Sequence, residues 1–217
     1  VLQIVLCFFL IAHGTDISSQ PVPVFWINQR FQSAGSCDIL INGAGGNQPG
    51  AIASVKMLKK EKQEDDYSFW DLKEENIRNV MDLNYMGTLL PIQVFTRDMV
   101  EKRKGSIINI ASVSSILPLS KVMAYSNAKS AVQSLTQWLA IHFGQSGIRC
   151  NAIVPGFIDT EMTRGVPEKA WDIMVGKISM GRAGTPEDIG NMIAFLASDE
   201  ASYITQGVFE VGGGMVL

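Results

Sequence analysis

The stretch from residue 105 to residue 129 constrains the fold of this 217-residue chain most strongly. It begins with an apolar, β-branched run at residues 107–110, which predicts a buried strand that ends before Ser112. A polar loop containing Pro118 follows, and a helical pattern begins near Ala124. A strand followed by a loop and a helix is typical of parallel sheets. The stretch therefore predicts an α/β protein with a doubly wound, Rossmann-like parallel sheet.

Tyr125 and Lys129 are four residues apart, so on a helix their side chains share one face. A free tyrosine has a pKa of about 10, and a neighbouring ammonium group favours the phenolate and lowers that pKa. With the Ser112 hydroxyl at the end of the adjoining strand, the pair predicts a proton-transfer centre for an alcohol or a carbonyl. Taken alone, the Tyr-x-x-x-Lys spacing is common by chance and favours a surface tyrosine beside an unrelated lysine.

The rest of the chain repeats the alternation of strands and helices, with no internal repeat and no linker, so we expect one domain over residues 1–217. Further strands are predicted at residues 38–41, 148–154 and 208–211, and helices at residues 71–102, 124–143 and 186–197. A capping box that begins at Asp71 is expected to start the first helix. Asn42, Ser112 and Pro155 follow strands, so they should meet at the carboxyl edge of the sheet.

Composition narrows the functional class. The chain is 47% hydrophobic and 18% charged with a net charge of -3, which indicates a globular protein. Its one basic run, at residues 56–62, is followed by acidic residues, so nucleic-acid binding is not expected. Cys7, Cys37 and Cys150 are scattered and lack metal-ligand spacing, so we expect no metal site. Reduced cysteines in a cytoplasmic protein are the simplest interpretation.

Residues 1–12 are almost entirely apolar but too few to span a membrane. A signal peptide would carry a basic leader, and no Lys or Arg precedes Arg30. We therefore predict a buried strand of the parallel sheet and no membrane partner. A secreted or membrane-anchored protein is the alternative that this segment leaves open.

The separations between Ser112, Tyr125 and Lys129 resemble those of the catalytic set in the short-chain dehydrogenase/reductase family. Three further motifs support the resemblance. The run Asn42-Gly43-Ala44-Gly45 follows a strand, as in the family; Asn84 matches a helix asparagine of the family; and residues 155–160 match its Pro-Gly-x-x-x-Thr loop. Four motifs in the expected order make chance matches improbable.

The resemblance implies the reversible, NAD- or NADP-dependent oxidation of a secondary alcohol to a ketone. In that family Tyr125 would be the acid/base, and Lys129 would lower its pKa and hold the nicotinamide ribose. Ser112 would hydrogen-bond the carbonyl oxygen, and Asn84 would anchor a water relay. The long helices at residues 71–102 and 124–143 would pair across a two-fold axis, so we expect a homodimer or homotetramer.

The resemblance also assigns the cofactor contacts. Around the nicotinamide we expect Pro155, Gly156, Ile158 and Thr160. Along the adenosine we expect Asn42, Gly43, Ala44 and Gly45. Asp16 is expected at the adenine.

The family's first glycine-rich turn, Thr-Gly-x-x-x-Gly-Ile-Gly, does not occur in this sequence. Such turns let the backbone approach a pyrophosphate. We therefore expect a chain that lacks the family's first β-α-β-α portion. The competing hypothesis is a non-catalytic remnant that folds or oligomerises without productive cofactor binding.

Residues 42–50 are similar to a narrower branch, the D-mannonate (fructuronate) oxidoreductases and gluconate dehydrogenases. This likeness implies a small-molecule substrate, a sugar acid, whose carboxylate needs a cation. Lys121 in the loop before Tyr125 is the candidate, and Asn47 and Gln48 are candidates for contacts with substrate hydroxyls. Simple solvation at the surface is the alternative for all three side chains.

Overall fold

The computed structural model describes residues 4–7, 36–58, 63–117 and 119–216. Within these residues the strands form one five-stranded sheet in chain order, and every neighbouring pair is parallel. The strands are β1 (Ile4–Cys7), β2 (Ile39–Asn42), β3 (Gly105–Ile110), β4 (Ile148–Pro155) and β5 (Val208–Val211). The predicted parallel α/β sheet is confirmed. A strand does occur within residues 1–12, whereas Asp16 lies outside the described residues.

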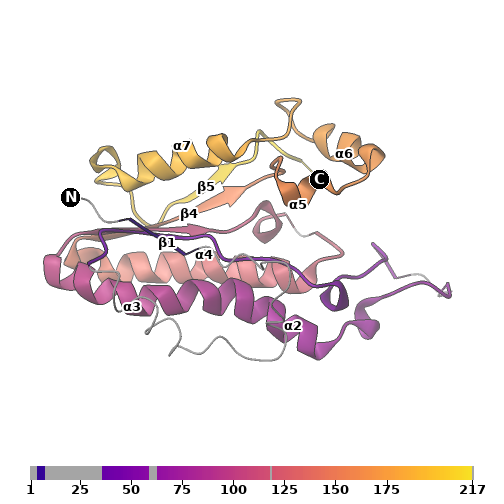
Figure 1. Cartoon of the computed structure of the whole chain (residues 1–217), viewed down its shortest axis with the longest axis horizontal. Coiled ribbons are helices and arrows are strands. Elements are labelled where there is room, and N and C mark those ends of the chain that lie inside the picture. The colour runs from indigo at the N-terminus through magenta and orange to yellow at the C-terminus, as the bar shows by residue number, and fades with distance from the viewer. Residues whose placement is uncertain (1–3, 8–35, 59–62, 118, 217) are drawn as a thin grey trace.

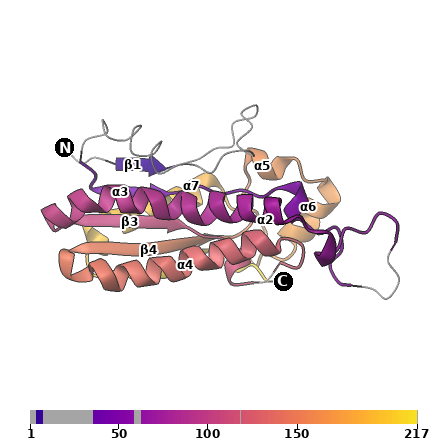
Figure 2. The same cartoon turned by 90° about the horizontal axis from the view of Figure 1, so that it is seen from below.

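Helices cover both faces of this sheet, which makes it doubly wound. The helices α3 (Gly87–Lys102) and α4 (Met123–Phe143) lie along one face, and α7 (Pro186–Ala197) lies along the other (Figure 1). Seen from the side of α3, the helix α2 (Glu74–Met81) continues the line of α3 and runs beside α4 (Figure 2). This layering buries both faces of the sheet and explains why its central strands are largely apolar.

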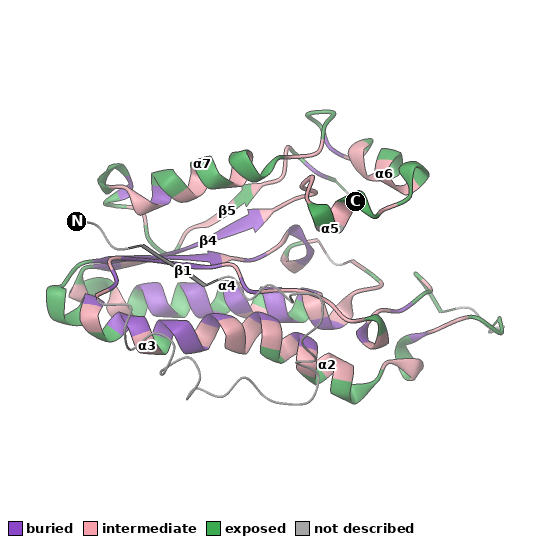
Figure 3. Cartoon of the chain, viewed as in Figure 1, coloured by how far each residue is buried: buried purple, intermediate pink, exposed green. Residues whose placement is uncertain are grey.

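Two apolar clusters hold the layers together. On the α3 and α4 face, Leu40 and Ile107 pack against Phe95 and Leu139. On the α7 face, a second cluster includes Ile41, Ile108, Ile153 and Leu196. Figure 3 shows the consequence: the central strands β2, β3 and β4 are largely buried, whereas the outward side of α7 is exposed. Packing on both faces thus holds the carboxyl ends of the strands in place.

The helix expected over residues 71–102 is divided in the structure. Asp71 does form a capping box, but with Ser68 and around a short 3-10 helix at Phe69–Asp71. The helix α2 begins only at Glu74, and its N-cap residue Lys73 makes no side-chain cap hydrogen bond. The predicted start at Asp71 was therefore wrong, because the acidic side chain caps the preceding turn instead. The predicted end at Lys102 is confirmed.

A π-helical turn at Asp82–Met86 separates α2 from α3. The N–H of Gly87 donates to the carbonyl of Asp82, five residues earlier, and Pro91 lies inside the following helix without an N–H to donate. Single π turns of this kind are often found at functional sites. Here the turn contains the fully buried Asn84.

The segment at residues 161–180 contains two short helices, α5 (Glu161–Arg164) and α6 (Glu168–Val175). Trp171 of α6 packs edge-to-face against Phe157, with 4.8 Å between ring centroids. Among the helices that the structure describes, none combines the length and apolar character needed to cross a bilayer.

Candidate active site

The three predicted strand-end positions do meet at one edge of the sheet. Asn42 is the last residue of β2 and pairs in register with Asn109 of β3. Ser112 follows β3 and begins a short 3-10 helix, η5 (Val113–Ser115), while Pro155 ends β4. Because the strands are parallel, all three positions lie at the carboxyl edge, where ligands of such sheets bind.

The structure brings Ser112, Tyr125 and Lys129 together. Tyr125 and Lys129 lie in the first two turns of α4, and the Lys129 Nζ is 5.8 Å from the centroid of the Tyr125 ring. Ser112 forms a side-chain hydrogen bond with Tyr125. Lys129 is 3% exposed, and its ammonium donates to the backbone carbonyls of Ala44 at 3.1 Å and Ile110 at 2.9 Å. The lysine thus links the ends of β2 and β3 beneath the tyrosine.

The electrostatics of this pair differ from the expectation. Burial raises the pKa of the Tyr125 phenol, and the hydrogen bond with Ser112 offsets part of that rise. Burial also lowers the pKa of Lys129 to about 8. The prediction that Lys129 depresses the pKa of Tyr125 is therefore wrong for the unliganded chain. The physical reason is that the ammonium is turned to two backbone carbonyls and both groups are desolvated.

Asn84 reaches the same site from the π turn. Its side-chain nitrogen donates to the carbonyls of Gly46 and Val80, each at 2.8 Å, and its side-chain oxygen accepts from the Gly46 N–H at 3.2 Å. The hydroxyl of Thr88 donates to the Asn84 backbone carbonyl at 2.9 Å. The Asn84 side chain therefore anchors the loop that follows β2. This is separate from the role in a water relay that is predicted for Asn84.

The glycine at position 45 has a specific structural reason. A Cβ atom there would lie 2.8 Å from the Asn84 Oδ1 and 2.8 Å from the Lys129 Nζ. A Cβ atom, which forms no hydrogen bond, essentially never lies that close to another heavy atom, so any larger residue at position 45 would displace both groups. At Gly45 the loop after β2 therefore packs closely against both the π turn and α4.

The other predicted cofactor residues line the same edge. The N–H of Gly156 donates to the Val211 carbonyl at 3.1 Å, and a Cβ at Gly156 would lie 2.6 Å from the Gly212 Cα. Ile158 forms an isolated parallel bridge with Gly184, and Thr160 is the N-cap of α5. The contacts of Gly156 fix the start of this loop against the end of β5, and the Ile158 bridge holds the loop against the segment before α7.

Two of the predicted substrate residues belong to the loop that Asn84 anchors. The side-chain oxygen of Gln48 accepts from the Asn76 amide of α2 at 2.9 Å, and the side-chain oxygen of Asn47 accepts from the Gln48 N–H at 3.0 Å. The Gln48 oxygen also accepts from the Asn79 amide at 3.5 Å, so both of its acceptor positions are used within the protein. The Asn47 oxygen retains one acceptor position for a ligand.

The structure does not bring Lys121 into the group formed by Ser112, Tyr125 and Lys129. Its backbone carbonyl accepts from the Ala53 N–H at 2.9 Å. Its side chain lines a small cavity of about 90 Å³, together with Phe69 and other residues of the loops before α2 and α4.

Sequence reasoning missed a buried polar chain beneath the site. The Asn42 Nδ2 donates to the Asn109 Oδ1 at 2.8 Å, and the Asn109 Nδ2 donates to the Thr136 hydroxyl of α4 at 2.9 Å. All three side chains are fully buried. The available signal was Asn109 itself, a polar residue within an otherwise apolar strand. Within the described part of the chain, no cluster of His, Cys, Asp or Glu could hold a metal ion.

Comparison with known proteins agrees with this geometry. A family model described as enoyl-(acyl carrier protein) reductase matches residues 16–216. The crystal structure of a candidate D-mannonate oxidoreductase from Haemophilus influenza with bound NAD superimposes with a TM-score of 0.79 and 39% sequence identity. The match covers 88% of this chain and 71% of that one.

Similar proteins include an uncharacterized oxidoreductase of Haemophilus influenzae, 42% identical over 195 residues, which cover 86% of this chain and 68% of the relative. The 3-oxoacyl-(acyl-carrier-protein) reductase of Thermotoga maritima is 36% identical over 191 residues, which cover 88% of this chain and 71% of that protein. The chain therefore belongs to the short-chain dehydrogenase/reductase family, as its motifs predicted, and its enzyme class is that of the NAD(P)-dependent dehydrogenases and reductases.

Proposed function

We propose that this chain interconverts a secondary alcohol and a ketone on a sugar acid, such as fructuronate and mannonate or gluconate. The observation that carries the proposal is the convergence of Ser112, Tyr125 and Lys129 at the carboxyl edge of the sheet. The similarity to a candidate D-mannonate oxidoreductase with bound NAD supports both the substrate class and the cofactor.

The residues present suit a nicotinamide dinucleotide. Lys129 commits two of its three ammonium protons to Ala44 and Ile110, which leaves one for a ribose hydroxyl. Gly45 after β2 and Gly156 after β4 lie where a Cβ atom would come within 3.0 Å of neighbouring atoms. Asn42, Gly43 and Ala44 would line the adenosine side, and Pro155, Ile158 and Thr160 would line the nicotinamide side. The cofactor, when bound, supplies or accepts a hydride at the substrate carbon.

The chain's own residues handle the proton. Because burial keeps the Tyr125 phenol protonated, Tyr125 is ready to donate its proton to the oxygen of a ketone as that ketone is reduced. Ser112 would donate a hydrogen bond to the same oxygen. Alcohol oxidation requires the reverse, so Tyr125 must first lose its proton. The rate of oxidation should therefore rise with pH toward the pKa of Tyr125, while the rate of reduction should fall.

Cofactor binding tests the proposal. The purified chain is titrated with NADH and, separately, with NADPH, and energy transfer from its tryptophans to the nicotinamide is followed. Saturable binding of one dinucleotide is expected, and its identity distinguishes NAD from NADP dependence. A flat response up to millimolar concentrations of both would favour the alternative, a chain that folds or associates without productive cofactor binding.

We infer a role for Lys121 in acid recognition, since the loop that carries it precedes Tyr125 directly. The substitution Lys121→Ala should raise KM for a sugar acid by about 10-fold, a loss of roughly 1.4 kcal/mol of binding, because one charge-assisted contact disappears. KM for the matching neutral polyol should stay the same. Equal changes in KM for both substrates would show that Lys121 does not bind the carboxylate of the substrate.

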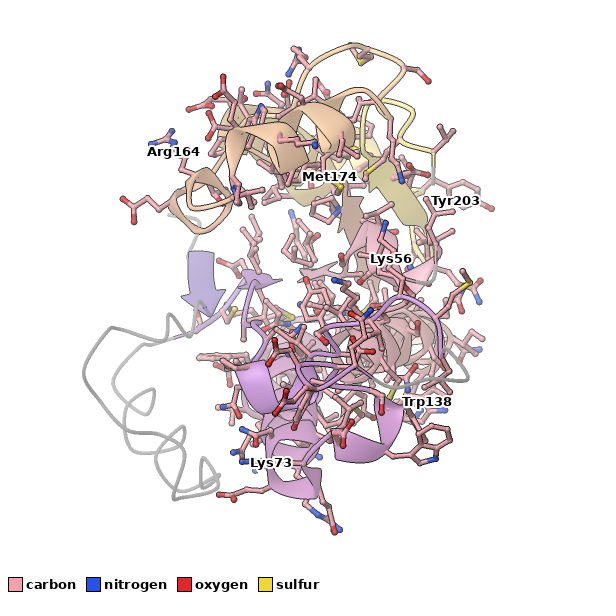
Figure 4. All side chains as sticks on the ribbon, turned by 90° about the vertical axis from the view of Figure 1, so that its right-hand side faces the viewer. Lys56, Lys73, Trp138, Arg164, Met174 and Tyr203 are labelled. Atoms are coloured by element: carbon pink, nitrogen blue, oxygen red, sulfur yellow. The ribbon has the colours of Figure 1, made fainter. Side chains whose placement is uncertain are left out.

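We also propose that the chain forms a homodimer or homotetramer through α3 and α4. Trp138 and Ile141 of α4 are 57% and 73% exposed, and Figure 4 shows Trp138 pointing away from the body of the protein. Exposed apolar side chains on one helix are a feature of interaction surfaces. Sedimentation velocity should show an oligomer that Trp138→Glu converts to monomer. An oligomer that is unaffected by this substitution would place the interface elsewhere.

A further inference from the structure

Ser114 forms two hydrogen bonds with the hydroxyl oxygen of Ser112. Ser114 lies in η5 and is 3% exposed. Its backbone N–H donates to the Ser112 Oγ at 3.2 Å, and its own hydroxyl donates to the same oxygen at 3.1 Å. A serine oxygen can accept two hydrogen bonds and donate one. Both acceptor positions of Ser112 are therefore filled by a single residue.

With both acceptor positions filled, Ser112 can form one further hydrogen bond, as the donor. The remaining partner of Ser112 is Tyr125, with which it forms a side-chain hydrogen bond. Since the Ser112 oxygen already accepts two hydrogen bonds, it has no lone pair left for the tyrosine hydroxyl. In the chain without substrate, Ser112 can then only donate toward the phenol oxygen, and the hydrogen bonds it accepts strengthen the one it donates.

The turn that holds Ser114 is fixed on α4. The Ser115 hydroxyl donates to the Ser112 backbone carbonyl, and the Gln133 amide of α4 donates to the Ser115 hydroxyl at 2.7 Å. The Ser130 hydroxyl donates to the Ser115 carbonyl at 3.2 Å. These contacts keep η5 in a constant position relative to the helix that carries Tyr125.

We propose that Ser114 is a positioning residue for the reaction, which fills both acceptor positions of Ser112 and thereby directs the Ser112 proton toward the Tyr125 oxygen. The proposal rests on the proposed function for its consequence in catalysis. Its physical content, the direction of one hydrogen bond, can be measured without substrate or cofactor.

Removing the Ser114 hydroxyl frees one lone pair on Ser112. Ser112 can then accept the proton of neutral Tyr125, which stabilises the phenol over the phenolate. Among the described charged groups, Lys129 of the same helix faces the ring, and the other elements packed near it contribute apolar side chains, namely Ala51, Ile77 and Val80. The pKa of Tyr125 should therefore rise in Ser114→Ala with little other electrostatic change.

The test is a pH titration of the full chain labelled with ¹³Cζ-tyrosine and followed by NMR, with the Tyr125 signal assigned from Tyr125→Phe. In Ser114→Ala the midpoint of Tyr125 should move up by about half to one pH unit, the equivalent of one hydrogen bond. Ser114→Thr, which keeps the hydroxyl, should restore the original midpoint.

Ser126→Ala is the matched control, since Ser126 is the next residue to Tyr125 and its buried hydroxyl has no hydrogen-bond partner among the described residues. That substitution should leave the midpoint unchanged. Adding Ser114→Ala to Ser112→Ala should have no further effect, because the acceptor is already gone. An unchanged midpoint in Ser114→Ala, an equal shift in Ser126→Ala or an additive double substitution would each overturn the proposal. A chain that shows the expected shifts but turns over no sugar acid would refute the proposed substrate and leave this inference standing.

Discussion

The substitution Tyr125→Phe should lower kcat by about 10³-fold, within the range that general acid–base catalysis contributes. Phenylalanine keeps the ring and its packing near Ala51, Val80 and Ala124 but removes the hydroxyl that Ser112 contacts. The loss should appear in kcat rather than in cofactor affinity, because the hydroxyl acts on the reacting oxygen. The measurement is steady-state kinetics beside a titration with the reduced dinucleotide.

Tyr203→Phe supplies the control for this prediction. Tyr203 is fully exposed, and it lies between the short 3-10 helix at Asp199–Ala201 and β5. Tyr203→Phe also removes a tyrosine hydroxyl, but at a position that does not contact the site, so kcat should not change. A Tyr125→Phe chain that retains more than a tenth of the activity would mean that another group transfers the proton.

The second large effect is expected from a single methyl group. Gly45→Ala places a Cβ 2.8 Å from both the Asn84 Oδ1 and the Lys129 Nζ. The Asn84 side chain is fixed by three hydrogen bonds to the backbone, so it cannot yield freely, and Lys129 must leave its carbonyl partners or the loop must shift. Displacements of about 1 Å cost on the order of 10²-fold in rate. We expect kcat/KM to fall by about that factor, together with weaker dinucleotide binding.

Gly190→Ala is the matched control for Gly45→Ala. Gly190 lies in α7, and a Cβ there would meet nothing within 4 Å. Alanine in a helix interior is favoured over glycine by about 1 kcal/mol, so this variant should be slightly more stable and fully active. A Gly45→Ala chain with normal kinetics would show that the loop after β2 adapts and that Asn84 and Lys129 do not depend on close packing at this point.

The elements predicted with most success were those with a one-sided or continuous apolar pattern. The last strand and α7 have the predicted bounds, and β3 and β4 differ from the predictions by a few terminal residues. The meeting of Ser112, Tyr125 and Lys129 followed from helical spacing and from the rule that parallel strands end at one edge.

The features that could not be predicted depend on burial and on which of several nearby partners a side chain contacts. The pKa of Tyr125 is set by burial rather than by the spacing to Lys129, and burial cannot be read from two residues four apart. Asp71 fits a capping box in the sequence, yet it caps with Ser68, three residues earlier, instead of starting α2. The hydrogen bonds that Ser114 donates to Ser112 arise from the geometry of one short turn, for which the sequence holds no periodic signal.

The central claim is that the group at the carboxyl edge of the sheet transfers a proton while a nicotinamide dinucleotide exchanges a hydride with a sugar acid. The most direct measurement is the loss of NADH or NADPH absorbance when the purified chain is mixed with fructuronate or another 2- or 5-keto sugar acid. We expect turnover that Tyr125→Phe lowers by about 10³-fold and that Tyr203→Phe leaves unchanged. Turnover in Tyr125→Phe above a tenth of the original rate would contradict this claim. No turnover with any keto sugar acid in a chain that binds the dinucleotide would contradict it as well.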